Sequence, residues 1–356
     1  MSRFADRRIE NISPYVPGEQ PRDRKYIKLN TNENPYYASA YAVSAVDGEL
    51  LLNLKRYSDP ECRDLASAIA DFYGVQSDQI MITNGSDEAL AFAFYAYCRQ
   101  GVCFADVTYG FYEVIARLFG CPVEKISLDE QFKIVPDNYF YKGKSVVIAN
   151  PNAQTGIALG GDKIEEIIAK NADNIVIIDQ AYADFGEFNA IELTKKYDNL
   201  VTVNTFSKSR SLAGARVGYI IADRRLIEDL KKVKNSFHPY NVNTVSQLLA
   251  ARAMEDREYF LSCMEKIKAT RASFAEQLIE RGFEVLPSSA NFVLARSPKT
   301  DGKSLYESLR AKGILVRHFN DERIAEYIRI TIGTDADMGR LLSAIDQITG
   351  ENNEKS

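Results

Sequence analysis

A lysine lies among hydroxyl side chains in the segment TFSKSRSLAGARVGY, residues 205–219. Lys208 follows an apolar run, Ser207 precedes it, and Arg216 comes eight positions later. A lysine amine becomes a nucleophile when burial or a nearby cation lowers its pKa, and it can then form a Schiff base with a carbonyl compound. Hydroxyl groups and a guanidinium suit a phosphate. The segment favours carbonyl chemistry beside a phosphate, although composition alone supports a solvated basic loop equally well.

A carboxylate closes the apolar run NIVIID, residues 174–179. Open α/β sheets place their ligand sites where strands end, so Asp179 is a candidate site residue. A protonated pyridine nitrogen is one suitable partner for such a carboxylate, and Tyr182, three positions later, could reach an oxygen of the same ring. An isolated aspartate at this point is more often a helix N-cap.

Three further turns carry polar or aromatic side chains at predicted strand ends. MITNGSDEAL places Ser86 and Asp87 at the start of a helix, where free backbone N–H groups and the helix dipole favour an anion. ANPNAQTGI places Asn152 in a tight turn, and TYGFYE places Tyr109 where its ring could stack on a planar group. Each of these has a purely structural alternative, and only their order along the chain favours one site.

Alternation of short β-rich runs with helical patterns predicts the elements that position these residues. Nearly continuous apolar runs such as SVVIA are typical of strands buried on both faces, as in a parallel sheet covered by helices. We expect strands at residues 101–105, 123–126, 145–149, 174–179, 200–206 and 217–222, and helices at 87–100, 111–119, 163–169 and 224–234. The pattern indicates an α/β domain.

A different pattern follows this domain. One helical stretch, residues 244–281, ends at Gly282, and the short strands FEVLP, ANFVLAR, GILVRHF and YIRITIG alternate with helices as in an α+β unit. The first 40 residues are rich in Pro, Asn and Tyr and favour an extended arm. We therefore expect an arm at 1–40 that packs on a partner or on the small domain, a large domain at 41–265 and a small domain at 266–356.

Composition excludes several classes of protein. The 44 basic and 49 acidic residues give a net charge of −5, which argues against a nucleic-acid binder. Only two histidines occur and the five cysteines form no CxxC pair, so we expect no metal site and reduced thiols in a core. With no long apolar run and a charged start, the sequence predicts a cytoplasmic protein without a membrane partner.

As an ordered set, these motifs resemble the fold-type I pyridoxal-phosphate aminotransferases, and within them the histidinol-phosphate aminotransferase family of L-histidine biosynthesis. The resemblance runs from ISPYVPG to YIRITIGT and includes LNTNENPY, RYSDP, NGSDE, NPNAQTG, DQAY and SKSRSLAGARVGY. It implies pyridoxal 5'-phosphate as cofactor, a large domain with a mostly parallel sheet flanked by helices, a smaller α+β domain, and a homodimer with shared active sites.

The resemblance also implies residue roles around the cofactor. Lys208 would carry the cofactor and move the substrate proton, Asp179 would pair with the ring nitrogen, Tyr182 would bond the ring hydroxyl, and Tyr109 would stack on the ring. The other implied cofactor contacts are Ser86, Asp87, Asn152, Ser207, Arg216 and, from the neighbouring subunit, Tyr57. The implied substrate contacts are Tyr15, Asn32, Arg317 and Arg329.

Two departures from the family pattern fall close to these residues. The usual turn Pro-Asn-Asn-Pro-Thr-Gly has Ala153 and Gln154 in place of its second Asn and second Pro, and Gln180 replaces a glutamate. The implied reaction moves an amino group from glutamate to imidazole acetol phosphate. Alternatives are a threonine-phosphate decarboxylase, an aromatic amino-acid aminotransferase on the same scaffold, and a non-catalytic cofactor-binding regulator.

Overall fold

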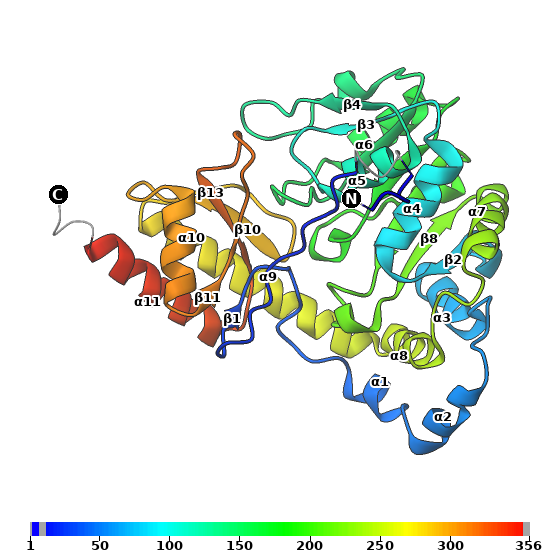
Figure 1. Cartoon of the computed structure of the whole chain (residues 1–356), viewed down its shortest axis with the longest axis horizontal. Helices are drawn as coiled ribbons and strands as arrows, with labels where there is room; N and C mark the ends of the chain where they lie inside the picture. Colours follow the sequence, from blue (N-terminus) through cyan, green and yellow to red (C-terminus); the bar gives the residue numbers. More distant parts are fainter. Residues whose placement is uncertain (1, 7–11, 352–356) are drawn as a thin grey trace.

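The computed structural model describes residues 2–6 and 12–351, which form a large and a small body side by side (Figure 1). Seven strands build the sheet of the large body: β2 (Ile80–Thr83), β3 (Val102–Ala105), β4 (Val123–Ile126), β5 (Ser145–Ala149), β6 (Val176–Asp179), β7 (Leu200–Thr205) and β8 (Gly218–Ala222). Their order is β2-β8-β7-β6-β5-β3-β4, and only β8 runs antiparallel to its neighbours. The predicted mostly parallel sheet is confirmed.

Both faces of this sheet are covered, which explains its apolar strands. The flanking helices are α4 (Gly85–Tyr97), α5 (Phe111–Phe119), α6 (Gly161–Lys170) and α7 (Arg224–Phe237). Along β5, Val147 packs with the cluster of α4, α5 and α7, whereas Val146 packs with Ile164 and Ile168 of α6. Successive side chains of a strand point to opposite faces, so each strand between two helix layers needs apolar residues throughout.

The strand directions gather the polar turns at one edge. Because β8 is antiparallel to both β2 and β7, strand β2 points the same way as β7 and the remaining parallel strands. The segments that follow β2, β3, β5, β6 and β7 therefore all leave the sheet at its carboxyl edge. Every turn that the sequence marked as chemical is one of these segments.

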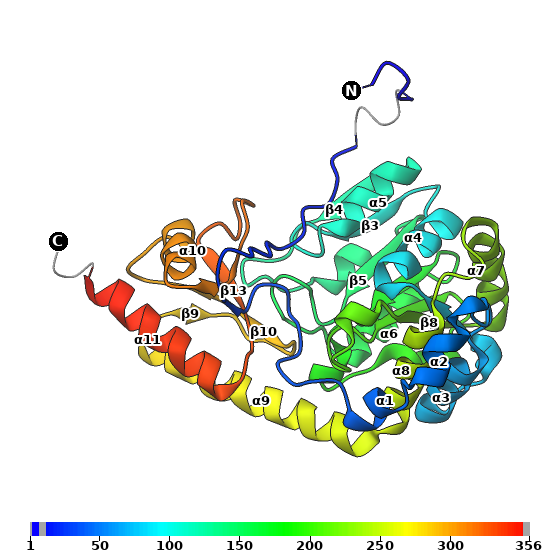
Figure 2. The ribbon, with the colours of Figure 1, turned by 60° about the horizontal axis from the view of Figure 1, so that its bottom comes forward.

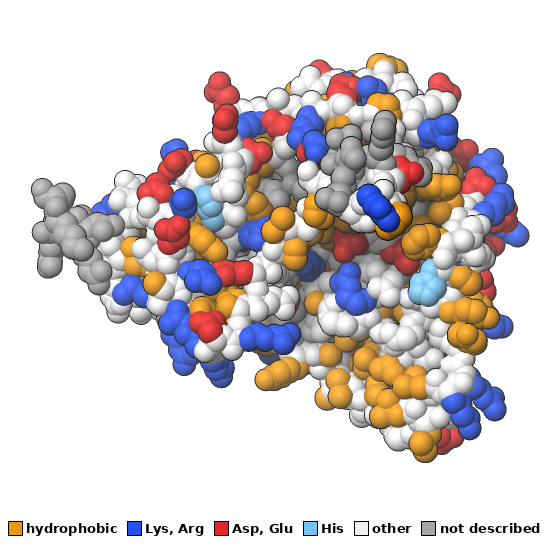
Figure 3. Space-filling model, in the orientation of Figure 1, with side chains coloured by type: hydrophobic (Ala, Val, Ile, Leu, Met, Phe, Trp, Pro, Cys, Tyr) orange, Lys and Arg blue, Asp and Glu red, His pale blue; other side chains and the backbone are white. Residues whose placement is uncertain are grey.

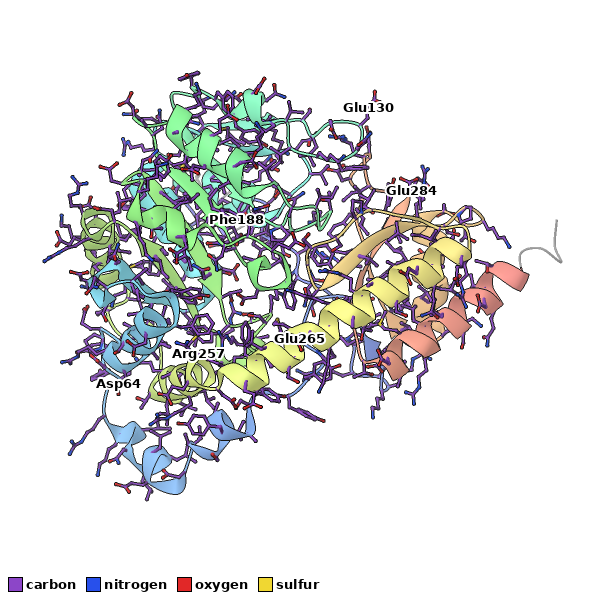
Figure 4. The ribbon with its side chains drawn as sticks, turned by 180° about the vertical axis from the view of Figure 1, so that it is seen from behind. Asp64, Glu130, Phe188, Arg257, Glu265 and Glu284 are labelled. Atoms are coloured by element: carbon purple, nitrogen blue, oxygen red, sulfur yellow. The ribbon has the colours of Figure 1, made fainter. Side chains whose placement is uncertain are left out.

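The predicted helix over residues 244–281 is wrong as a single element. The structure has α8 (Thr244–Glu255) and α9 (Arg257–Glu280), because Asp256 ends one helix and caps the next by accepting a hydrogen bond from the Tyr259 amide. Helix α9 runs along the underside and joins the two bodies (Figure 2), passing Arg257 and Glu265 on its way to the small body (Figure 4). The sequence patterns did not predict three further helices, α1 (Ala40–Ser44), α2 (Gly48–Leu52) and α3 (Arg63–Tyr73). They lie on the side of the large body away from the small body (Figure 1).

The small body is an antiparallel sheet with two helices. Strands β9 (Glu284–Val285), β10 (Phe292–Arg296), β12 (Arg317–His318) and β13 (Tyr327–Thr331) have the order β12-β13-β10-β9, next to α10 (Gly302–Ala311) and α11 (Asp335–Glu351). The arm joins it, because β1 (Ile27–Lys28) pairs in parallel with β11 (Ile314–Leu315). The α+β pattern is confirmed; the exact domain boundaries stay a prediction, and residues 7–11 of the arm lie outside the described residues.

The cysteines belong to the packing of the fold. All five are buried and free of disulfides. Burial raises the pKa of Cys62, Cys98 and Cys103 to about 12, so these thiols stay protonated at neutral pH. Within the described part of the chain, no helix has the length and apolar character of a membrane span, and no cluster of His, Cys, Asp or Glu is arranged to hold a metal ion.

Candidate active site

Lys208 stands just beyond β7, at the carboxyl edge of the sheet. Its Nζ donates a hydrogen bond to the Thr31 carbonyl oxygen at 2.8 Å and lies 6.0 Å from the centre of the Tyr182 ring. Burial, together with the positive charge of Arg329, lowers the pKa of Lys208 to about 8. At neutral pH the amine is therefore deprotonated far more often than that of an ordinary surface lysine.

Asp179 ends β6, the strand next to β7. Its Oδ2 accepts a hydrogen bond from the Tyr112 hydroxyl at 2.7 Å, and its Oδ1 accepts one from the Ala181 amide at 3.0 Å. Burial raises the pKa of this carboxyl to about 6, although the two hydrogen bonds oppose the rise. Among the described residues no basic side chain forms an ion pair with Asp179, which is only 4% exposed. A buried carboxylate in this state favours a cationic ligand.

Tyr182 follows β6 and is fixed by the arm. Its hydroxyl accepts a hydrogen bond from Asn32 Nδ2 at 2.9 Å. Asn32 is itself held, because Thr331 donates to its Oδ1 and Asn291 donates to its carbonyl oxygen. Its φ of 57° lies in the left-handed region that asparagine tolerates better than most residues. Arm, large body and small body therefore meet at Asn32.

The start of α4 forms a cradle with a basic rim. Gly85 has a φ of 76°, and a Cβ added there would lie 2.5 Å from Arg216 Nη2, so the guanidinium packs directly on this backbone. Asp87 links Arg216 to Tyr109, because it accepts hydrogen bonds from Arg216 Nη2 at 3.2 Å and from the Tyr109 hydroxyl at 2.9 Å. Ser86 lies in the first turn of α4. The free N–H groups of a helix start, together with Arg216, suit a phosphate.

The hydroxyl of Ser207 is also at this edge. Ser207 is buried and accepts a hydrogen bond from Thr205 at 3.0 Å. Its Oγ–H can still donate to a ligand, because a hydroxyl both accepts and donates.

Two arginines face each other across β12 and β13. Arg317 is the register partner of Arg329, a like-charge pair that is unfavourable unless an anion or other acceptors compensate it. Arg329 Nη1 donates to the Ala153 carbonyl and to Gln154 Oε1, both at 3.0 Å, and its buried Nε has no hydrogen-bond partner among the described residues. Arg317 instead donates to carbonyl oxygens of the arm, at Val16 and Pro17.

Three of the predicted site residues either lie away from Lys208 and Asp179 or already use their side chains in contacts within the protein. The Tyr15 ring meets the edge of the Tyr109 ring, with centres 5.7 Å apart, as the arm crosses between the bodies (Figure 2). Tyr57 is 84% exposed and stacks on Tyr240. Asn152 donates to Val107 and Thr155 and accepts from Thr108, so both of its amide N–H groups are used within the protein. The ligand roles of these residues stay predictions.

Comparison with known proteins places this geometry in a family. The sequence profile of "Aminotransferase class I and II" matches residues 24–345. The chain belongs to the class I and II aminotransferases. Among curated proteins it is 45% identical to "Histidinol-phosphate aminotransferase" of Pseudomonas putida (strain W619), covering 97% of this chain and 100% of that protein. It is 43% identical to the protein of that name from Clostridium acetobutylicum, covering 98% and 99%. The expected family is confirmed.

Solved structures confirm the fold of this aminotransferase. The histidinol-phosphate aminotransferase of Clostridium acetobutylicum superimposes with a TM-score of 0.84 at 25% identity, covering 91% of this chain and 99% of that one. The enzyme of Sinorhizobium meliloti, solved in complex with pyridoxal-5'-phosphate, gives a TM-score of 0.89 at 21% identity, covering 99% and 98%. That second likeness concerns the fold alone.

The side chains of this aminotransferase fit pyridoxal phosphate. Asp179 is a buried carboxylate with no ion-pair partner among the described residues, Lys208 has an amine of lowered pKa, and the start of α4 with Arg216 offers donors to a phosphate. A ring with a basic nitrogen, an aldehyde and a phosphate satisfies all three.

Sequence reasoning missed four partners of the site residues. Tyr112 bonds Asp179, Thr31 bonds Lys208, Gln154 bonds Arg329, and Thr331 bonds Asn32. All four pairs join residues more than 60 positions apart, which local patterns do not reveal. Two of these partners carried a sequence signal: Gln154 departs from the usual family turn, and Tyr112 lies three positions after Tyr109, at the start of α5.

Proposed function

We propose that this aminotransferase transfers the amino group of glutamate to imidazole acetol phosphate, using pyridoxal 5'-phosphate and forming L-histidinol phosphate in L-histidine biosynthesis. The observation that carries the proposal is the pairing of a lysine of lowered pKa with a buried carboxylate on adjacent strand ends, Lys208 and Asp179. Relatives named histidinol-phosphate aminotransferase match this chain over nearly their whole length, which supports this choice of substrate.

Several groups would hold the cofactor. Lys208 would hold it through Nζ, Asp179 would face its ring nitrogen, Tyr182 its ring oxygen, and Tyr109 its ring face. The groups assigned to its phosphate and surroundings are Ser86, Asp87, Asn152, Ser207, Arg216 and Tyr57 of a second copy. Asp87 would act by orienting Arg216 and Tyr109, since it already bonds both. When bound, pyridoxal phosphate delocalises the negative charge that develops at the substrate Cα.

Lys208 is the group suited to move the substrate proton. A general base works best when its pKa lies near the working pH, and the pKa of Lys208 is about 8. The Thr31 carbonyl orients Nζ through the 2.8 Å hydrogen bond. We assign Lys208 the removal of the proton from the Cα of the amino donor and its return to the acceptor.

Asp179 sets the charge of the ring. An ionised carboxylate keeps a proton on the nearby ring nitrogen, and the hydroxyl of Tyr112 favours that ionised form. Tyr182 has a raised pKa because it is buried, so its hydroxyl keeps its proton and can donate to the ring oxygen while accepting from Asn32.

The two arginines are assigned to the anionic groups of the substrates. Glutamate presents a carboxylate and imidazole acetol phosphate a phosphate, and a guanidinium binds either anion through paired donors. Arg329 reaches from β13 toward the turn after β5, and Arg317 lies beside it on β12. Tyr15 and Asn32 would complete the pocket from the arm.

A second copy of the chain is assigned to the apolar surface at α1 and α2. Figure 3 shows hydrophobic side chains gathered over these helices. Tyr37 is 92% and Leu52 79% exposed, and the exposed Tyr57 follows shortly after. Exposed apolar patches of this kind mark interaction sites. A homodimer through this surface would bring Tyr57 of one copy to the other copy's site.

The proposal is tested by following glutamate formation from histidinol phosphate and 2-oxoglutarate. The wild-type protein is expected to form glutamate in amounts equal to the keto product, and Lys208→Ala is expected to lose at least a thousandfold in kcat. Full activity in Lys208→Ala would overturn the assignment. Release of carbon dioxide from threonine phosphate without a keto acid would instead favour a decarboxylase.

A further inference from the structure

Gln154 occupies a position where the usual family turn has proline, and its side chain reaches the substrate-side arginine. Its Oε1 accepts a hydrogen bond from Arg329 Nη1 at 3.0 Å, next to the bond from the same nitrogen to the Ala153 carbonyl. The side chain is 8% exposed, so this contact is largely screened from water. A guanidinium only donates hydrogen bonds, which fixes the amide orientation with its oxygen toward Arg329.

The turn that carries Gln154 is rigid. Asn152 fastens it through hydrogen bonds to Val107, Thr108 and Thr155, and the Gly156 amide donates to the Asn152 carbonyl at 2.9 Å. Gly156 has a φ of 78° and packs so closely on Ser288 that an added Cβ would lie 2.5 Å from Ser288 Oγ. Because the backbone of this turn is held in place, the Gln154 side chain starts from a fixed position. Its hydrogen bond therefore fixes the orientation of the Arg329 guanidinium.

Arg329 has few other fixed partners. Nη2 makes only a long contact of 3.4 Å with the Asn30 carbonyl, and the buried Nε has none within the described chain. The rings of Phe292 and Phe319 lie 5.1 and 5.3 Å from the guanidinium carbon. The opposed Arg317 repels it electrostatically. The Ala153–Gln154 turn is therefore the element that holds the guanidinium against this repulsion.

We propose that Gln154 is a positioning residue that fixes Arg329 for the anionic group of both substrates. This inference rests on the proposed function, because it takes Arg329 as the anion site. A proline at this position has no side-chain acceptor, and Ala153 offers Arg329 only its backbone carbonyl. The side-chain hydrogen bond to Arg329 therefore depends on the glutamine of this chain. An arginine held in one orientation loses less freedom when the anion binds, and affinity rises accordingly.

The test compares wild type with Gln154→Met, which keeps the length of the side chain and removes the acceptor. The KM for glutamate and for histidinol phosphate is expected to rise about tenfold, because the guanidinium is no longer held in the orientation that receives the anion, while kcat stays within about twofold. Cofactor affinity is expected to stay unchanged. The melting temperature is expected to fall by only about 2–4 °C, because one hydrogen bond to the buried Arg329 is lost, and this small shift distinguishes positioning from general damage. An unchanged KM, or a fall in kcat with equal KM, would overturn the inference.

A double-mutant cycle separates this inference from the proposed function. Arg329→Met should raise both KM values, and adding Gln154→Met to it should change them by less than about twofold, because the coupled partner is gone. If Arg329→Met leaves KM unchanged, the anion-site assignment of the proposed function fails. If Arg329→Met raises KM and Gln154→Met acts by the same factor in both backgrounds, only the role of Gln154 fails.

Discussion

The hydroxyl of Tyr112 donates to Asp179 Oδ2 at 2.7 Å inside the core of the large body. Tyr112 lies on α5 and Asp179 ends β6, so the bond ties the helix that follows Tyr109 to the base of the site. Both side chains are buried, and the bond offsets part of the cost of keeping a carboxylate there. The charge of the cofactor ring would depend on this pair.

Tyr112→Phe is expected to weaken cofactor binding about tenfold and to lower kcat by a similar factor. A hydrogen bond to a charged group contributes about 1.5–3 kcal/mol, and part of that loss falls on the charged state of Asp179. Titration of the cofactor-free protein with pyridoxal phosphate measures the first effect. Tyr97→Phe is the matched control, since Tyr97 donates to the Leu226 carbonyl away from the site. Equal behaviour of the two variants would contradict the role of Tyr112.

The rate at which cofactor-free protein reacts with pyridoxal phosphate is expected to rise with pH around a midpoint near 8. Only the neutral amine of Lys208 attacks the aldehyde, and the pKa of that amine is about 8. Replacing Arg329 with Met should move the midpoint upward, because the positive charge of Arg329 lowers the pKa. Stopped-flow absorbance between pH 6 and 10 measures both midpoints. A wild-type midpoint above 10 would contradict the buried, lowered amine.

Arg323 joins the small body to the large one. Its Nη1 donates to Asp106 Oδ2 at 2.7 Å, and its Nη2 donates to the Asp129 carbonyl at 2.8 Å. Arg323→Ala is expected to lower the free energy of unfolding by about 1–3 kcal/mol, since partly buried donors to charged and carbonyl oxygens are lost. Arg296→Ala is the control and should cost about 0–1 kcal/mol, because its pair with Glu284 is exposed. Urea denaturation compares the two, and equal losses would contradict a bridging role for Arg323.

Leu52→Glu is expected to convert the proposed homodimer into monomers. Leu52 is 79% exposed in a single chain, and a carboxylate within the proposed apolar interface would be desolvated without a partner. Light scattering after size-exclusion chromatography should give about twice the 40.0 kDa chain mass for wild type and about that mass for the variant. Leu118→Glu, at an exposed site on α5, is expected to stay dimeric. A monomeric wild-type protein would contradict the assigned surface.

Local patterns predicted the elements that are buried on both faces. Strands β5, β6 and β7 are readable because both of their faces are packed, and the chemistry of Asp179 and Lys208 follows from where β6 and β7 end. The break at Asp256 was not predicted because apolar spacing continues across it, and only the capping geometry ends α8 there. Helices α1 and α2 have five residues each, too few for a periodic pattern.

The inner contacts of the site could not be predicted for a different reason. Gln154 meets Arg329 from 175 positions away, and Lys208 meets Thr31 from 177. Such pairs depend on how the arm and the small body settle on the sheet, which is decided by tertiary packing and leaves no local periodicity. The types of residue at the site were visible in the sequence, whereas the partners that orient them required the fold.

The most direct measurement of the central claim is a half-reaction with one amino donor. Purified protein carrying pyridoxal phosphate is mixed with histidinol phosphate and no keto acid, and the cofactor spectrum is recorded. We expect conversion of the aldehyde form into the amine form, one equivalent per site, with Lys208→Ala at least a thousandfold slower. No conversion by histidinol phosphate in a protein that converts with phenylalanine would contradict the proposed substrate, and no conversion by any amine would contradict the transaminase itself.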